Sequence, residues 1–329
     1  MSHRILAGIA LFLMAAAHCF ALDTGTADVD AFIDTMVAKH DYDRAELERI
    51  LGEAEVKQSI LEQIAKPAEK TLTWKDYRPI FMTSERIQAG ANFWREHRES
   101  LEKISLQTGV PAEIIVGIIG VETYFGRITG GHRVLDALAT LAFHYPPRAS
   151  FFRRELEEFL LLVREEKIAA TDAFGSYAGA MGRPQFMPSS FRAYAVDSTG
   201  DGKRDIWNDW TDVAGSIANY FVAHGWQPGS EITSQATLSS RYNGPPPENK
   251  LSADVTVGAL SKAGVVFSTG LDCDAPGRLL ALDGSDGTEY WVGFHNFFVI
   301  TRYNRSVMYA LAVHQLGQEI ALEVNGRES

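Results

Sequence analysis

The chain has 329 residues, of which 31 are Lys or Arg and 42 are Asp or Glu, so its formal net charge at pH 7 is −11. This acidic balance, with no Lys/Arg-rich run, argues against nucleic-acid binding, which normally requires a basic face toward the phosphates. With 46% hydrophobic and 22% charged residues, the composition excludes a disordered or fibrous chain and indicates a globular protein with a sizeable core.

Residues 1–21 have the features of an export signal. Arg4 precedes an apolar run over residues 5–17, and Ala21 stands where a signal peptidase commonly cuts. The run is too short to span a bilayer comfortably. We therefore expect a signal peptide that is cleaved near Ala21 and a periplasmic location for the mature chain.

The chain has two cysteines, and one of them belongs to the export signal. His18 precedes Cys19, whereas a lipid-modified cysteine normally follows a small residue, so we expect no lipid anchor. Cleavage leaves Cys273 alone, which excludes an internal disulfide and a cysteine-based zinc site. Stability must then come from packing.

The mature chain is predicted to be mainly α-helical. Residues 28–66 show helical spacing of apolar side chains among charged neighbours. After Pro67, residues 71–79 are expected to form an extended connection. Helical spacing resumes over residues 84–225 and returns at 306–321.

Between the last two helical stretches, the character of the sequence changes. Thr, Ser, Val and turn residues dominate, and the pairs Asp283-Gly284 and Asp286-Gly287 stand between apolar runs, as in β-hairpins. We expect a small inserted β-domain here. The predicted division is a signal peptide, an N-terminal helical region, a helical core, the β-domain and a C-terminal return to the core, at residues 1–21, 22–75, 76–227, 228–293 and 294–329.

The first chemical signal is a carboxylate on the apolar face of a predicted helix. This helix is expected to start at Pro111 and to end at Gly126. Glu122 falls inside its apolar stripe, four residues after Ile118 and three before Phe125. A carboxylate there is either paired, as in a structural site, or kept protonated, which is the state a general acid requires.

The second signal is the segment 175–190, which is rich in glycine and other small residues. Such a segment serves either close packing or a close approach of the backbone to a ligand. Its polar side chains, among them Ser176, Tyr177 and Gln185, favour a substrate cleft.

The third signal has the spacing of an EF-hand calcium loop, with a glycine at position 6. Position 12 is an asparagine, so Asp209 or Asp212 would have to supply the last carboxylate. The alternative is a solvated acidic turn before a helix. Oxygen ligands favour calcium over a transition metal. Positions 1, 3, 5, 7 and 9, the seventh through its backbone carbonyl, are Asp197, Thr199, Asp201, Lys203 and Asp205.

The fourth signal is a β-branched, apolar run at residues 297–301, which is expected to form a strand. The run leads to Tyr303 and Asn304 at a junction with the last helix. Ser306 is placed to cap that helix, and Tyr309 faces back toward the junction. An aromatic–amide pair at such a junction is common in sugar sites.

Together, these segments resemble the lytic murein transglycosylase B family, bacterial enzymes that cleave the glycan strands of peptidoglycan. The spans GIIGVET, SYAGAMG, QFMPSS, GDG and RYNRS occur in the family's order between about Trp74 and Leu316. The resemblance implies a lysozyme-like helical core with an N-terminal helical region and a small β-domain, which agrees with the organisation inferred from periodicity.

The resemblance also assigns roles by motif, with Glu122 matching the catalytic acid/base. Arg183-Pro184 departs from the family pattern beside the cleft. The matched cleft residues are Tyr77, Ser176, Gln185, Tyr220, Tyr303, Asn304 and Tyr309. The implied ligands of a structural calcium ion are Asp197, Thr199, Asp201, the Lys203 carbonyl and Asp212.

The implied reaction cleaves the β-1,4 bond between N-acetylmuramic acid and N-acetylglucosamine and forms a 1,6-anhydromuramoyl product, with Glu122 as the single acid and base. One alternative is a muramidase that hydrolyses peptidoglycan, although no motif offers the second carboxylate that most glycosidases use. Another is a non-catalytic peptidoglycan-binding scaffold. We expect a monomer that acts on peptidoglycan glycan strands, with other cell-wall enzymes as further candidate partners and no nucleic acid.

Overall fold

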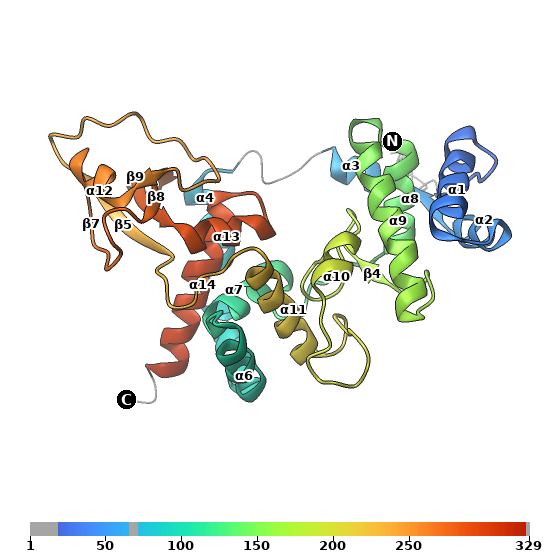
Figure 1. Cartoon of the computed structure of the whole chain (residues 1–329), viewed down its shortest axis with the longest axis horizontal. Helices are drawn as coiled ribbons and strands as arrows, with labels where there is room; N and C mark the ends of the chain where they lie inside the picture. The colour runs from blue at the N-terminus through green and yellow to red at the C-terminus, as the bar shows by residue number, and fades with distance from the viewer. Residues whose placement is uncertain (1–18, 66–71, 327–329) are drawn as a thin grey trace, which may run out of the picture.

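The computed structural model describes residues 19–65 and 72–326. Helices dominate, as predicted, and they form two lobes that meet near the middle of the molecule (Figure 1). Within the described residues, no single helix is long and apolar enough to cross a membrane. The consecutive helices at 98–108 and 112–123 meet that test only as a pair, and they are bent by 118°.

The smaller lobe joins the N-terminal helices to two helices from the middle of the chain, the blue and green ribbons on the right of Figure 1. The Tyr42 hydroxyl donates to the Leu160 carbonyl, and Lys39 and His40 both contact Glu157. The predicted N-terminal region therefore packs onto part of the predicted core. The helices of this lobe are α1 (Ala27–His40), α2 (Arg44–Gly52), α3 (Gln58–Ile64), α8 (Val134–His144) and α9 (Ala149–Glu166).

A short strand begins the described chain. β1 (Cys19–Ala21) pairs antiparallel with β2 (Glu55–Lys57), and the side chain of Asp136 on α8 accepts from the Glu55 amide at 2.9 Å. β1 covers the last three residues of the predicted signal peptide, so in the structure these three residues pair with the fold. The rest of that signal lies outside the described residues.

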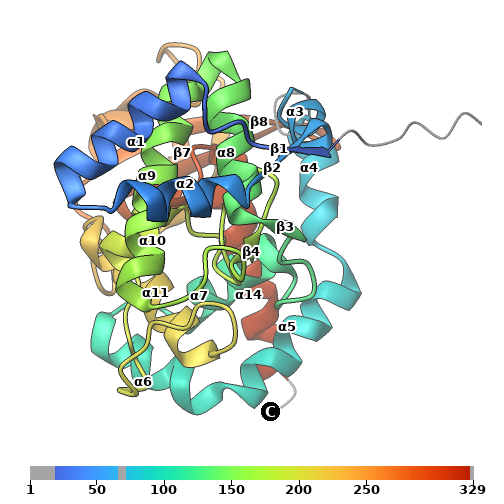
Figure 2. The same ribbon diagram turned by 90° about the vertical axis from the view of Figure 1, so that its right-hand side faces the viewer.

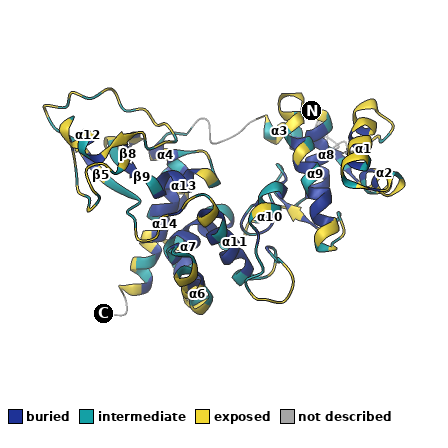
Figure 3. Cartoon of the chain, viewed as in Figure 1, coloured by how far each residue is buried: buried dark blue, intermediate teal, exposed yellow. Residues whose placement is uncertain are grey.

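The larger lobe is built around α14, which packs against α7, α5 and α4 and is the dark red helix of Figure 2. Its buried face merges with those of the other helices into one core (Figure 3). The helices are α4 (Trp74–Phe81), α5 (Ser84–Glu96), α6 (Arg98–Thr108), α7 (Ala112–Thr123), α10 (Pro188–Tyr194), α11 (Trp210–Ala223), α13 (His295–Tyr303) and α14 (Val307–Asn325).

Two segments are helical where extended structure was predicted. In α4, Trp74, Tyr77 and Phe81 repeat at helical spacing and are all buried, while Pro79 lies in the last turn, where it ends the helix soon after. Residues 297–301 belong to α13. This run is buried throughout, and a continuous apolar run does not distinguish a strand from a buried helix.

The predicted small β-domain is confirmed as a five-stranded antiparallel sheet with strand order β6-β8-β9-β5-β7. Ser285 and Asp286 form the tight turn between β8 and β9, where Gly284 pairs with Gly287. Gly287 has a φ of 114°, which favours glycine. The elements are β5 (Thr233–Leu238), β6 (Val255–Thr256), α12 (Val257–Lys262), β7 (Val265–Phe267), β8 (Pro276–Gly284) and β9 (Gly287–Phe294).

Candidate active site

Glu122 lies in the last turn of α7. The helix starts directly after Pro111 and is broken by Tyr124, Phe125 and Gly126, which have φ values of 50°, 56° and 79°. The predicted limits of this helix are therefore close to the observed ones. The rest of α7 is almost entirely buried, whereas Glu122 is partly exposed. The helix thus presents a carboxylate at its end, at the border between core and solvent.

Glycines bring α7 and α14 unusually close together. A Cβ atom at Gly117 would lie 2.4 Å from the Val313 carbonyl oxygen, and one at Gly317 would lie 2.2 Å from the Glu113 carbonyl oxygen. Both distances are far inside van der Waals contact, so no larger residue fits without a shift. The helices run antiparallel in this contact, which brings the start of α14 to the end of α7.

Tyr309 reaches Glu122 across that contact. Its hydroxyl donates to Glu122 Oε1 at 2.6 Å, and the side chain is 1% exposed. Burial, and then the nearby Glu122 charge, raise the pKa of Tyr309 well above its ordinary value. The hydroxyl therefore stays protonated and acts as a donor to the carboxylate. Ser306 caps α14 by accepting from the Tyr309 amide at 3.3 Å, as predicted.

Tyr303 and Tyr220 form a second aromatic group beside this pair. The Tyr303 hydroxyl donates to the Pro184 carbonyl and the Tyr220 hydroxyl to the Arg302 carbonyl, both at 2.6 Å. Burial raises the pKa of Tyr303 well above 10 and that of Tyr220 to about 12. The two rings lie 4.9 Å apart. Both hydroxyls are thus held by the protein backbone, and Tyr220, only 8% exposed, supports Tyr303 from within the protein.

Asn304 follows Tyr303 at the junction between α13 and α14. Its backbone is extended, with φ −137° and ψ 128°, and its carbonyl accepts from the Ser306 amide at 2.7 Å. The position of this junction agrees with the sequence prediction. It joins two helices, however, and not a strand and a helix.

The glycines of segment 175–190 serve internal packing. A Cβ atom at Gly175 would lie 1.9 Å from the Ala180 carbonyl oxygen, one at Gly179 would lie 2.5 Å from the Leu138 side chain, and one at Gly182 would lie 2.7 Å from the Ile206 carbonyl oxygen. Their neighbours are protein atoms, so these glycines are explained without a ligand. The substrate role of the segment rests on its polar side chains.

Those polar side chains are partly exposed and locally anchored. Ser176 Oγ accepts from the Ala178 and Ala180 amides. Gln185 has a φ of 54°, and its side-chain NH2 donates to the Thr129 carbonyl at 3.0 Å and the Gly182 carbonyl at 2.8 Å. The loop therefore fixes both residues before any ligand binds.

Arg183-Pro184 links the segment 175–190 to α7, the helix that carries Glu122. Thr123, the residue after Glu122, donates its hydroxyl to the Arg183 carbonyl at 3.2 Å, while the Pro184 carbonyl holds Tyr303. The Arg183 guanidinium stacks on the ring of Trp210, 3.9 Å from its centroid. This connection was not predicted, because it runs through backbone carbonyls that carry no sequence signal.

Arg86 is a further residue that the sequence did not single out. It donates to the Gly120 carbonyl at 3.0 Å, and its guanidinium lies 4.5 Å from the centroid of the Tyr124 ring. It thus holds the last turn of α7 on both sides of Glu122.

Tyr77, which was predicted to line the cleft, lies on α4. It is 4% exposed and packs between Trp74 and Phe81.

The predicted calcium loop forms a compact turn before α11. Asp197 accepts from the Thr199 hydroxyl and from the backbone amides of residues 200–202, and Asp201 accepts from the Lys203 amide at 2.9 Å. Asp212 is buried and accepts from the amides of residues 198, 199 and 205. Among the described residues, no group of three or more His, Cys, Asp or Glu side chains is arranged to hold a metal ion.

Three of the predicted calcium ligands nevertheless have an arrangement that suits a hard cation. Asp197, Thr199 and Asp201 lie within one turn, and positive-φ Gly200 and Gly202 leave the space beside it open. The carboxylate of the buried Asp212 accepts hydrogen bonds from loop amides. Burial raises the pKa of Asp212 even though these hydrogen bonds act to lower it. It is the ligand that the geometry supports least.

A comparison with known proteins gives concordant matches. A family model described as a transglycosylase SLT domain matches residues 25–318. The membrane-bound lytic murein transglycosylase B of Escherichia coli K12 is 44% identical over 302 residues, which are 88% of this chain and 82% of that protein.

Solved structures agree with these matches. The catenated lytic transglycosylase SltB1 of Pseudomonas aeruginosa has 49% identity and a TM-score of 0.87, covering 91% of this chain and 99% of that one. The Escherichia coli lytic transglycosylase Slt35, solved in complex with calcium, has 43% identity and a TM-score of 0.83, covering 92% and 95%. The predicted lysozyme-like fold class is thereby confirmed.

Replacing Tyr309 with Phe is expected to lower the free energy of unfolding by about 1 kcal/mol, because it removes the hydrogen bond between a buried hydroxyl and Glu122. Tyr290→Phe is the matched control, since the Tyr290 hydroxyl makes no hydrogen bond within residues 19–65 and 72–326. Urea unfolding measures both changes. Equal losses in the two variants would mean that the bond to Glu122 contributes nothing specific.

Proposed function

Because the chain belongs to the transglycosylase SLT domain family and is a lytic murein transglycosylase, an enzyme that acts on peptidoglycan, we propose that Glu122 is its single catalytic acid and base. The observation that carries this proposal is the bond from Tyr309 to Glu122. It places a neutral donor against one carboxylate at the border of the core.

In the first step, protonated Glu122 gives its proton to the glycosidic oxygen between the muramoyl C1 and the N-acetylglucosamine O4. The C1–O bond breaks, and the bonding electrons leave with the protonated oxygen. The carbonyl oxygen of the muramoyl acetamido group stabilises the positive charge at C1. The Tyr309 hydroxyl then stabilises the Glu122 carboxylate that is left behind.

In the second step, the Glu122 carboxylate removes the proton from the muramoyl 6-hydroxyl, and O6 attacks C1 to close a 1,6-anhydro ring. Glu122 is protonated again, and no water is consumed. One carboxylate therefore suffices, in contrast to the two that most glycosidases use. Ser176 and Asn304 are proposed to hold the acetamido group, and Gln185 to orient the intermediate.

The tyrosines are proposed to shape the cleft around these polar groups. Tyr303 would present its ring to the sugar while its hydroxyl stays on Pro184. Tyr220 and Tyr77, both buried, would set the positions of Tyr303 and Tyr309 and would contact sugar less directly than predicted from the sequence.

Digestion of purified peptidoglycan sacculi by this protein should release muropeptides with 1,6-anhydromuramoyl ends, because the attacking oxygen is intramolecular. Mass spectrometry distinguishes these ends from reducing muramic acid, which is heavier by one water. Reducing ends as the main product would show that water attacks C1 and that the enzyme is a muramidase. Binding to sacculi without either product would indicate a scaffold.

We further propose that the loop at 197–212 binds a structural calcium ion through Asp197, Thr199, Asp201 and the Lys203 carbonyl, with Asp212 as the remaining ligand. Slt35, whose structure includes calcium, supports this. The ion would neutralise clustered carboxylates and fix the loop that starts α11, the helix that carries Tyr220.

Excess chelator is expected to lower the melting temperature of the calcium-loaded wild type by several degrees, because a ligand that binds only the folded state stabilises it. Asp201→Asn should reduce this shift, and Asp272→Asn, which removes an exposed acid elsewhere, should not. A melting temperature that does not respond to chelator would make the loop a solvated acidic turn.

Export of the chain to the periplasm is proposed from residues 1–21, with cleavage near Ala21 and without lipid at Cys19. The cleavage site decides whether β1 remains paired with β2, since β1 ends at Ala21. N-terminal sequencing of the secreted protein tests this directly.

A further inference from the structure

A cavity of about 400 Å³ lies between α4, α14 and the β8–β9 hairpin. It is separate from the residues assigned to the reaction. The α4 wall carries Lys75 and Arg78, and the hairpin wall carries Asp286 and Glu289. Its volume lies within the range of ligand pockets, about 300–1,000 Å³.

The opposite charges on the two walls do not neutralise each other. Among residues 19–65 and 72–326, neither Lys75 nor Arg78 forms an ion pair. Arg78 donates to the amide oxygen of Gln315 at 2.7 Å, and Glu289 accepts from the Trp74 indole at 3.1 Å. The pocket therefore keeps a cationic wall and an acidic wall apart.

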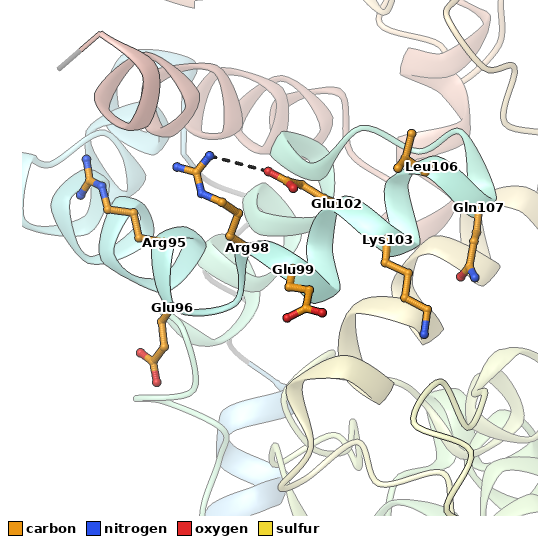
Figure 4. Close-up of a pocket in the computed structure, with 8 residues that line it drawn as sticks. All are labelled: Arg95, Glu96, Arg98, Glu99, Glu102, Lys103, Leu106 and Gln107. Carbon is orange, nitrogen blue, oxygen red and sulfur yellow. Dashed lines mark ion pairs between the residues drawn. The ribbon is translucent and has the colours of Figure 1, made fainter. Parts of the chain in front are cut away.

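The face at the junction of α5 and α6 also carries charged side chains, but two of them form an ion pair (Figure 4). There, Arg98 and Glu102 form an ion pair of 3.6 Å on one helix, and Arg95 donates to the Glu323 carbonyl. In the figure, the side chains on that face project from the two helices and line a separate pocket. Lys103 on this face is exposed and serves below as a matched control.

The chemistry of the pocket disfavours a neutral sugar. Sugars are usually held by accessible aromatic faces, and of the two tryptophans that line this pocket Trp74 is only 1% exposed and Trp291 is half-buried, beside four charged side chains. A ligand with separated charges fits better, with a carboxylate facing Lys75 and Arg78 and an ammonium group facing Asp286 and Glu289. Peptidoglycan carries such groups on its peptides, whereas its N-acetylated sugar rings are uncharged.

The pocket also lies within reach of the reaction site. Gln315 on its wall is six residues beyond Tyr309 on α14, which corresponds to about 9 Å along the helix axis. Three extended peptide residues span about 10 Å. Tyr77, which packs against Trp74, lies on the same short helix as Lys75 and Arg78.

We infer that this pocket, defined by Lys75, Arg78, Asp286, Glu289 and Gln315, binds the charged peptide of peptidoglycan while the glycan strand occupies the cleft at Glu122. The inference rests on the proposed function, because it assumes that the glycan lies at Glu122. It assigns to the β-domain a role in selecting peptide-bearing strands.

The test measures binding in the Glu122→Gln protein, so that no turnover occurs. Calorimetry compares an N-acetylglucosamine–N-acetylmuramic acid disaccharide with and without its peptide, and the ratio of the two affinities reports the contribution of the peptide. Lys75→Glu and Asp286→Lys should each reduce this ratio about tenfold, the loss of one charge-assisted hydrogen bond. Lys103→Glu, with the same change of charge as Lys75→Glu, should leave it unchanged.

The outcomes separate the two proposals. A ratio that stays at the parent value in both Lys75→Glu and Asp286→Lys overturns the peptide pocket, whatever the activity of the enzyme. An equal fall in the Lys103→Glu control also overturns it, since a general charge effect would then explain the data. If the bare disaccharide shows no binding while the affinity of the peptide-bearing one falls in both Lys75→Glu and Asp286→Lys, the glycan assignment at Glu122 fails, and only the binding of the peptide to the pocket is supported.

Discussion

The close contact between α7 and α14 is the constraint on which the rest of the site depends. Gly117 and Gly317 allow carbonyl oxygens of the opposite helix to lie where a side chain would otherwise be. This approach places the first turn of α14 beside the last turn of α7, and so brings the Tyr309 hydroxyl to Glu122. A larger residue at either glycine would separate the two groups by pushing the helices apart.

The helix contact explains how one carboxylate can serve two steps of a reaction. Burial keeps Tyr309 and Tyr303 protonated, as the raised pKa of each shows, so neither competes with Glu122 for the proton. Tyr309 is a fixed donor that favours the ionised carboxylate after the first transfer. Arg86 and Thr123 hold the turn on either side, which limits the motion of the carboxylate between leaving oxygen and 6-hydroxyl.

Sequence reasoning succeeded where a local pattern carries the information. The stripe around Glu122 predicted α7, the Asp-Gly turns predicted the β8–β9 hairpin, and Ser306 predicted the cap of α14. It failed where tertiary packing decides. The apolar run at 297–301 suits a strand or a buried helix equally well, and the burial that selects the helix comes from distant parts of the chain.

Gly179 and Gly182 show the same limit, since their neighbours, Leu138 and Ile206, are distant in sequence. The pairing of α8 and α9 with the N-terminal helices was likewise missed, because residues such as Tyr42 and Leu160 meet across more than a hundred positions. The side chains of the site could be named from motifs. Their hydrogen-bond partners, mostly backbone carbonyls, could not.

The central claim, that Glu122 alone is acid and base, is tested most directly by single-turnover cleavage of purified glycan strands by Glu122→Gln. Glu113→Gln, which changes the other acid of α7 in its first turn, is the matched control. The account predicts a loss of about 10²–10⁴-fold for Glu122→Gln and a rate close to wild type for Glu113→Gln. Cleavage by Glu122→Gln at more than a few per cent of the wild-type rate would contradict it.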